Sequence, residues 1–244
     1  MKNKTILITG GASGLGFAIA NDLHTSGQTV VIFDINADSL NRVDDVFDKY
    51  QVDVTNYDAV QTAVDTVVES HGRIDVLINS AGIIHSEPII NILNPTQRKH
   101  SFHSFRNVLK LNLESVFIVT SIVAETMVLK RTKGCIINIS SISAQGNAGQ
   151  TAYSAAKGGV ESMTKTWGKE LGLFGIRTNV ISPGFIDTPS TELALNAKTI
   201  DHIIQNTPLR KLGDTKSICQ TVRYLMENDF VNATVTHVDG GLSL

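Results

Sequence analysis

The chain has 244 residues, of which 42% are hydrophobic and 18% are charged, and its mean hydropathy is close to zero at +0.06. This balance excludes a disordered chain, and the length permits one sizeable α/β domain or two small ones. The continuous spacing of the motifs described below favours one domain over residues 1–244. The 21 basic and 23 acidic residues leave a net charge of −2, so we expect neither nucleic acid nor a membrane as a partner.

The start of the chain and its two cysteines indicate a compartment. Residues 1–4 are polar and lead straight into a strand-like segment, unlike a signal peptide, and we see no apolar run of membrane-spanning length. Cys135 lies in an apolar run far from Cys219, so we interpret both as buried thiols rather than as a disulfide. We therefore expect a cytoplasmic protein.

Short apolar runs rich in β-branched residues predict seven strands. In chain order they are Thr5–Thr9, Val30–Phe33, Tyr50–Val54, Val76–Ile78, Cys135–Ile139, Thr178–Ile181 and Thr234–Val238. Between them, apolar residues recur at helical spacing around 18–23, 60–67, 108–122, 156–171 and 218–225. Apolar strands that alternate with helices predict a parallel, doubly wound, Rossmann-type sheet with helices on both faces.

The segment Leu93–Arg106 interrupts this periodicity with Pro95, two phenylalanines and several basic or imidazole side chains. We expect an inserted loop here. Its His100 and His103 have no matched third ligand in the sequence, and two histidines alone are more often surface residues than a metal site. We therefore predict no bound metal.

The first predicted strand leads into Thr9-Gly10-Gly11-Ala12-Ser13-Gly14-Leu15-Gly16 and then into a helix. Glycines let the main chain turn tightly and approach a pyrophosphate, whose charge is met by unpaired N–H groups at the helix N-terminus. The spacing differs from GxGxxG, and structural turns also use glycines. The loop alone therefore leaves both interpretations open.

Polar residues at the ends of later strands favour the nucleotide interpretation. Asp34 lies 18 residues after Gly16, close to the offset expected for a carboxylate that binds an adenosine ribose, although a helix N-cap is the structural alternative. Asp53-Val54 and Asn79-Ser80-Ala81-Gly82 end the third and fourth predicted strands at the same sheet edge. Four strand ends thus converge on one crevice.

A second group of residues indicates proton chemistry. Tyr153 and Lys157 are four residues apart and share one helix face. Lowering a tyrosine pKa from ~10 by some 3 units takes about 4 kcal/mol, which an ammonium group and a nicotinamide cation could supply together. Asn112 lies on an apolar helical stripe, so we expect it to be buried with hydrogen-bond partners.

Together these motifs resemble those of the short-chain dehydrogenase/reductase family, from Lys4 to Gly241. The glycine loop is similar to the family's TGxxxGxG, residues 79–82 to its NNAG with one substitution, and residues 153–157 to its YxxxK. Pro183-Gly184 and residues 238–241 are similar to later landmarks. The resemblance implies a seven-stranded parallel sheet, commonly a homotetramer, and hydride transfer between a nicotinamide and a carbonyl or secondary alcohol.

The resemblance also implies catalytic roles. Tyr153 would act as the acid/base, and Lys157 would lower its pKa and hold the nicotinamide ribose. Asn112 would anchor a water that relays protons to the lysine.

The serine that polarises the substrate oxygen is less directly assigned, because Ser140, Ser141 and Ser143 all follow the fifth strand. Alignment of the strand selects Ser141, whereas counting back from Tyr153 selects Ser140. We favour Ser141, because loops absorb deletions more readily than strand ends do.

The same comparison of motifs implies the cofactor contacts. Ile186 would offer its main chain to the nicotinamide carboxamide and Thr188 its hydroxyl, or Thr188 could cap the following segment, and residues 188–206 resemble a mobile substrate lid. The predicted cofactor-binding residues are Gly10, Ser13, Gly14, Leu15, Gly16, Asp34, Asp53, Val54, Asn79, Ala81, Gly82, Tyr153, Lys157, Pro183, Gly184, Ile186 and Thr188.

We therefore predict an oxidoreductase that interconverts a secondary alcohol and a ketone, working as a homotetramer or homodimer. NAD is expected rather than NADP, because Asp34 would repel a 2′-phosphate and neither Ser13 nor Ile35-Asn36 supplies a compensating cation. The alternatives are an NADPH-dependent 3-oxoacyl-(acyl-carrier-protein) reductase, which Asp34 disfavours, and a non-catalytic nucleotide-sensing protein, which the complete Ser-Tyr-Lys-Asn set disfavours. The substrate itself does not follow from the fold.

Overall fold

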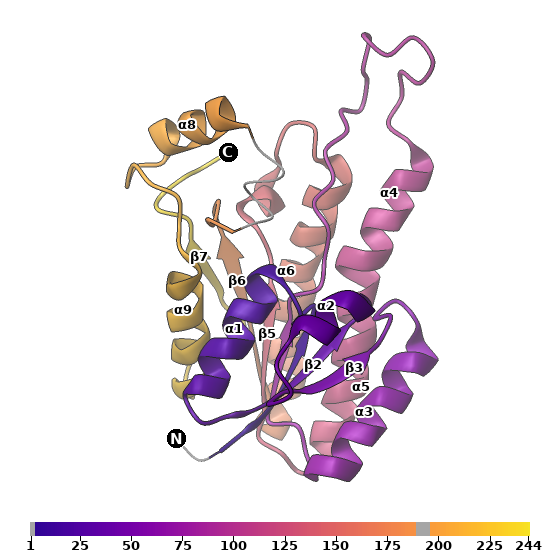
Figure 1. Ribbon diagram of the computed structural model, residues 1–244, viewed down its shortest axis with the longest axis vertical. Helices are drawn as coiled ribbons and strands as arrows, with labels where there is room; N and C mark the ends of the chain where they lie inside the picture. Colours follow the sequence, from indigo (N-terminus) through magenta and orange to yellow (C-terminus); the bar gives the residue numbers. More distant parts are fainter. Residues whose placement is uncertain (1–2, 189–195) are drawn as a thin grey trace.

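The structure is a computed structural model that describes residues 3–188 and 196–244, and its centre is one parallel sheet (Figure 1). Seven strands pair in the order β3-β2-β1-β4-β5-β6-β7, which confirms the predicted Rossmann-type fold. The strands are β1 (Thr5–Thr9), β2 (Thr29–Asp34), β3 (Asp48–Gln51), β4 (Val76–Asn79), β5 (Cys135–Ile139), β6 (Arg177–Pro183) and β7 (Val235–Val238). The chain order reverses between β1 and β4, where ligands bind in folds of this kind.

Helices cover both faces of the sheet (Figure 1). The α-helices are α1 (Gly14–Thr25), α2 (Ala37–Arg42), α3 (Tyr57–His71), α4 (Phe102–Leu109), α5 (Ser115–Leu129), α6 (Thr151–Leu171), α8 (Ala197–Asn206) and α9 (Thr215–Glu227). Helices α1, α2 and α9 pack with Ile6 and Ile8, whereas α3 and α5 pack with Leu7 on the opposite face. Successive residues of β1 thus pack into two separate hydrophobic cores, as expected where side chains alternate between the two faces of a sheet.

The strand predictions are most accurate at the centre of the sheet. Strands β1 and β5 have the predicted bounds and are buried throughout. The predicted strand Tyr50–Val54 is displaced, because β3 ends at Gln51. Strand β3 is at the sheet edge and pairs with β2 alone, so it needs no apolar run; the apolar Val52 and Val54 are instead buried in the loop that leads to α3.

The predicted insertion is in part helical. After β4 the chain projects beyond α4 and returns, with an antiparallel bridge between Ile90 and Lys99 (Figure 1, upper right). We name residues 84–101 the excursion. The expected loop Leu93–Arg106 ends at Ser101, because the Ser101 hydroxyl accepts a hydrogen bond from the Ser104 amide (3.2 Å) and caps α4.

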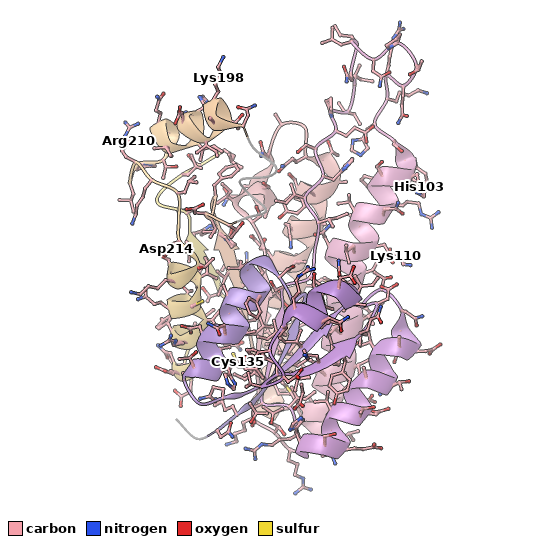
Figure 2. The ribbon with its side chains drawn as sticks, in the orientation of Figure 1. His103, Lys110, Cys135, Lys198, Arg210 and Asp214 are labelled. Carbon is pink, nitrogen blue, oxygen red and sulfur yellow. The ribbon has the colours of Figure 1, made fainter. Side chains whose placement is uncertain are left out.

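Two expectations about apolar segments have different outcomes. Cys135, labelled in Figure 2, and Cys219 are buried free thiols, as predicted. The expectation that no apolar run approaches membrane-spanning length is wrong, because the continuous helical stretch Phe102–Leu129 is long and apolar enough by length and composition. Half of the apolar 18-residue window within this stretch is buried inside the protein, and Val119 and Met127 belong to the core on one face of the sheet. Its apolar character is that of a core helix.

Candidate active site

The glycine loop between β1 and α1 is built for close main-chain contacts. Gly10 has φ +64° and Gly14 has φ +53°, a region that favours glycine. A Cβ on Gly10 would lie 2.8 Å from the Ala81 Cα, and one on Gly16 only 2.2 Å from the Gly10 carbonyl oxygen. Ser13 is the N-cap of α1 and its side chain makes no capping hydrogen bond, so the first N–H groups of α1 are available to an anion.

Asp34 lies at the end of β2 and faces this loop. Its carboxylate accepts hydrogen bonds from the Ala12 amide (3.1 Å) and the Asn36 amide (3.0 Å). The structure removes the alternative of a helix N-cap at Asp34. Asn36 occupies that position in α2, and its side chain accepts the Ser39 amide at 2.9 Å.

The third and fourth strand ends are placed differently from each other. Asp53 is two residues beyond β3, where its carboxylate accepts hydrogen bonds from the amide and the hydroxyl of Thr55 (2.9 and 2.7 Å), and Val54 is buried. The Asn79 amide group donates to the Thr120 hydroxyl (2.9 Å) and to the Asn138 side chain (2.8 Å). The Asn79 side chain therefore ties β4 to β5 and α5.

Asn112 lies in a π-helical turn, Lys110–Glu114, between α4 and α5. It is fully buried, as predicted, with its Oδ1 accepting the Ile83 amide (3.1 Å) and its Nδ2 donating to the Val108 carbonyl (3.0 Å). A Cβ on Gly82 would lie 2.5 Å from Asn112 Oδ1 and 3.7 Å from Lys157 Nζ. Gly82 thus leaves the space in which the amide and the lysine approach each other. Such π-turns often occur at functional sites.

Tyr153 and Lys157 both lie on the buried face of α6. The Lys157 ammonium donates to the Ile139 carbonyl (2.8 Å) and lies 5.7 Å from the centroid of the Tyr153 ring. Burial lowers the pKa of Lys157 to about 8.

The lowered Tyr153 pKa expected from the sequence includes the charge of a nicotinamide cation and stays a prediction, whereas in the protein alone the Tyr153 pKa is raised. Burial raises the pKa of the Tyr153 hydroxyl, and its hydrogen bond with Ser141 offsets only part of that effect. The Lys157 ammonium is already engaged by the Ile139 carbonyl and lies beside the ring. Tyr153 is therefore held in its neutral, proton-donating form.

The three serines after β5 have different partners. The Ser141 side chain is hydrogen-bonded to Tyr153 and accepts the Ser143 amide (3.1 Å). Ser140 is buried, and its hydroxyl donates to Glu161 on α6 (2.9 Å). Of the two serines that the sequence left in competition, Ser141 is the one that lies beside the tyrosine.

The predicted nicotinamide end follows β6. Pro183 ends the strand, and a Cβ on Gly184 would lie 2.8 Å from the Asp239 Cα, so the main chains pass closely there. Ile186 is buried and bridges to Gly213, and Thr188 is the last residue described before the gap. Within the predicted lid, residues 189–195 lie outside the described residues, and the rest is Asn196 with α8.

One group was missed by sequence reasoning. His100, predicted as a surface residue, has a side chain only 6% exposed and lies with His85 beside the Glu87 carboxylate. His103 does lie on the surface of α4, next to Asn107 (Figure 2). His85 and His100 are separated by a chain reversal of no fixed spacing, so no sequence signal could have joined them.

Comparisons with known proteins agree with this architecture. Residues 10–243 match a family model described as enoyl-(acyl carrier protein) reductase. The chain is 36% identical to 3-oxoacyl-(acyl-carrier-protein) reductase FabG of Thermotoga maritima, covering 99% of this chain and 98% of that protein. It is 30% identical to sorbitol-6-phosphate 2-dehydrogenase of Klebsiella pneumoniae (99% and 96%) and 34% identical to 3-hydroxyacyl-CoA dehydrogenase type-2 of Bos taurus (100% and 97%). The crystal structure of gox2181 superimposes with a TM-score of 0.90 at 27% identity, covering 99% and 96% of the two chains.

These relatives have different named substrates, whereas the fold and the match extend over the whole chain. The protein is an NAD(P)-dependent oxidoreductase acting on an alcohol or ketone group. The chain belongs to the short-chain dehydrogenase/reductase family.

Proposed function

We propose that the enzyme reversibly oxidises a secondary alcohol with NAD as its cofactor, and Asp34 carries this assignment. Its carboxylate is held against the glycine loop by the Ala12 amide, at the end of β2 and next to β1, beyond which the chain order reverses. Ribose hydroxyls would donate hydrogen bonds to this carboxylate, whereas a 2′-phosphate would meet a like charge. Loss of these hydrogen bonds, together with the charge repulsion, should make NAD preferred over NADP by roughly 10²-fold.

The predicted cofactor residues line one path along the strand ends. The main-chain amides of Gly10, Ser13, Gly14, Leu15 and Gly16 would bind the pyrophosphate, and Asp53 with Val54 would border the adenine. Asn79, Ala81 and Gly82 would follow toward the nicotinamide, which Pro183, Gly184, Ile186 and Thr188 would hold. Bound NAD supplies the hydride acceptor.

The catalytic residues would bind the substrate's oxygen and transfer its hydroxyl proton. We assign Ser141 to hold the oxygen, because its side chain is hydrogen-bonded to Tyr153. Tyr153 takes the hydroxyl proton in oxidation and returns it in reduction. Lys157 holds the nicotinamide ribose, and Asn112, near Lys157 across Gly82, positions a relaying water. Since burial raises the pKa of Tyr153, oxidation should accelerate toward alkaline pH.

The cofactor assignment is tested by kcat/KM with NAD and with NADP. The wild type should favour NAD, and Asp34→Ser combined with Ile35→Arg should move the preference toward NADP. Asp38→Ser, in the first turn of α2, is the matched control and should leave the preference unchanged. Equal use of both cofactors by the wild type would contradict the role of Asp34.

A second candidate activity is reduction of a 3-oxoacyl group carried on a protein thioester. The observation in its favour is the 36% and 34% identity to the FabG reductases of Thermotoga maritima and Haemophilus influenzae. Asp34 disfavours the NADPH form of that activity. A screen of NAD reduction over sugar alcohols, hydroxy acids, hydroxyacyl thioesters, diols and steroids separates the candidates.

We also propose that residues 1–244 form one catalytic domain that assembles as a homodimer or homotetramer in the cytoplasm. Phe117 and Leu129 are 52% and 74% exposed, and both line a groove between α5 and α6 that also contains Trp167. Such an apolar surface is suited to a second copy of the chain. Sedimentation of Phe117→Asp and Leu129→Asp should show smaller species than the wild type.

A further inference from the structure

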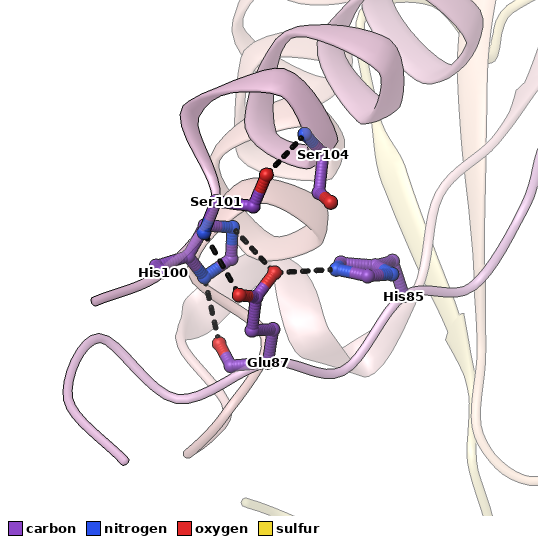
Figure 3. Close-up of polar contacts among 5 residues, drawn as sticks. All are labelled: His85, Glu87, His100, Ser101 and Ser104. Carbon is purple, nitrogen blue, oxygen red and sulfur yellow. Dashed lines mark hydrogen bonds and ion pairs between the residues drawn. The ribbon is translucent and has the colours of Figure 1, made fainter. Parts of the chain in front are cut away.

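The excursion and its base bring together two imidazoles and a carboxylate (Figure 3). The Glu87 Oε2 lies 3.1 Å from His85 Nε2 and 3.8 Å from His100 Nε2. One ligand atom from each of the three residues can be chosen so that all lie within 4.8 Å of one another. These side chains are 33%, 22% and 6% exposed for His85, Glu87 and His100, so they form a partly buried cluster at the base of the excursion.

The surrounding contacts orient His100 and Glu87 toward a common centre, and His85 Nε2 is within hydrogen-bond distance of Glu87 Oε2 (3.1 Å). The His100 Nδ1 lies 2.8 Å from the Glu87 carbonyl oxygen, which requires the proton on Nδ1 and leaves a lone pair on Nε2. The Glu87 Oε1 accepts the Ser101 amide (2.8 Å), so Oε2 is directed to the imidazoles (Figure 3). Metal-binding histidines are usually held in this way, with the second ring nitrogen donating to a carbonyl or carboxylate.

An independent observation is that the buried His100 Nε2 has no hydrogen-bond partner within the described residues. A buried polar atom left unpaired is energetically unfavourable, and here it faces a carboxylate and a second imidazole. We propose that His85, Glu87 and His100 bind a divalent transition metal of the zinc class. Two nitrogen ligands and one oxygen ligand suit zinc, whereas Mg²⁺ and Ca²⁺ select oxygen ligands.

The cluster geometry is compatible with this ion. Zn–N and Zn–O distances of about 2.0–2.2 Å in a tetrahedral site place ligand atoms about 3.3–3.5 Å apart, so modest side-chain movement closes the cluster. Three protein ligands leave a fourth position for water. The site differs from the sequence-based expectation of no metal, which rested on His100 and His103 and lacked the two other ligands.

The position of the cluster indicates what the metal would do. The Glu87 amide donates to the Gly149 carbonyl (2.6 Å), and the Gln150 side chain donates to the Ser86 hydroxyl (3.1 Å). Gly149 and Gln150 directly precede α6, which carries Tyr153. A bound ion would therefore fasten the excursion to the segment that enters the catalytic helix, and would stabilise the protein without taking part in proton transfer.

The test is zinc binding by the tag-free, full-length protein after treatment with a chelator and desalting. Calorimetric titration with ZnCl₂ should show one site per chain, and Co²⁺ should give a visible absorption band. His85→Ala and Glu87→Gln should each weaken zinc binding at least about 10-fold. At a hundredfold excess over Kd, zinc should raise the wild-type Tm by roughly 5–10 °C.

His103→Ala is the matched control, because His103 lies a few residues away on the surface and should leave both readouts unchanged. Circular dichroism verifies that His85→Ala, at a side chain one-third exposed, is folded. Absence of stoichiometric zinc binding by the wild type would overturn the proposal. So would a zinc affinity of His85→Ala and Glu87→Gln equal to that of the wild type. Neither readout depends on turnover, so the result is independent of the proposed function.

Discussion

The cofactor side and the substrate side of this enzyme are built in different ways. The cofactor side is made of strand ends and the glycine loop, where Gly10 and Gly16 allow main-chain approaches that a Cβ would forbid. The proposed substrate side includes the excursion, where the His85, Glu87 and His100 side chains come together across a chain reversal. The difference teaches that short sequence motifs can predict a site formed by the strand ends of a central sheet, whereas they do not predict a site formed by loops.

The largest effect should come from the tyrosine that stands between the two sides. Tyr153→Phe keeps the buried ring and removes only the transferable proton, so kcat should fall by about 10²–10⁴-fold. NAD affinity should stay within a few-fold. Single-turnover kinetics and fluorescence titration measure the two quantities separately, and a parallel loss of both would show that the tyrosine acts mainly in cofactor binding.

A glycine substitution tests the claim that the cofactor side depends on main-chain approach. Gly16→Ala places a Cβ 2.2 Å from the Gly10 carbonyl, so the free energy of unfolding should fall by about 1–3 kcal/mol and NAD binding should weaken. Gly172→Ala is the control: its φ is −55° and its Cβ would meet no atom closer than 3.7 Å. Denaturant titration of both variants gives the comparison, and equal stability would show that the loop relaxes freely.

The same contrast explains how much of the fold the sequence could predict. The buried central strands β1 and β5 were predicted with their observed bounds, because apolar residues on both faces leave a continuous signal. Strand β3 was displaced, since an edge strand of sequence Asp-Lys-Tyr-Gln carries no such signal. Helix α2 was missed because six residues are too few for a helical period to show.

At the site, residue identity was easier to predict than environment. Ser141 was favoured from strand alignment, and the structure joins its side chain to Tyr153. The direction of the Tyr153 pKa in the protein alone was not predicted, because the degree of burial around a hydroxyl depends on packing from several elements. The partners of His100 could not be predicted, since they depend on where the excursion returns to α4.

The buried lysine gives a pH-dependent test of the catalytic helix. Burial lowers the pKa of Lys157 to about 8, so the unfolded chain binds the extra proton between about pH 8 and 10.5. The buried Lys157 ammonium destabilises the folded state fully below about pH 8, and this destabilisation is lost as the pH rises from about 8 to 10.5. Relative to Lys157→Met, the wild type should therefore gain on the order of 2 kcal/mol of stability between pH 7 and pH 9.5.

Urea unfolding of the wild type and Lys157→Met at several pH values measures this difference, because the other titrating groups are common to both proteins. Lys165→Met, on the exposed face of the same helix, should run parallel to the wild type at every pH. A stability difference between the wild type and Lys157→Met that does not change with pH would mean that Lys157 is solvated in solution.

The smallest effect should come from the returning arm of the excursion. Arg98 and Lys99 are exposed, and charges in water are screened within about 8–10 Å at physiological salt, so each contributes weakly. If the excursion borders the substrate mouth, the double variant Arg98→Ala/Lys99→Ala should raise KM for an anionic substrate about two- to fivefold at low salt, with kcat unchanged. The effect on KM should shrink as ionic strength rises, and KM for a neutral substrate should not change.

Sedimentation of the same variant separates this result from a role in assembly, because loss of a subunit contact would lower the apparent mass instead. Unchanged KM together with unchanged sedimentation would leave Arg98 and Lys99 as solvated side chains, and the proposed functional part of the excursion would then be confined to its base at His85, Glu87 and His100.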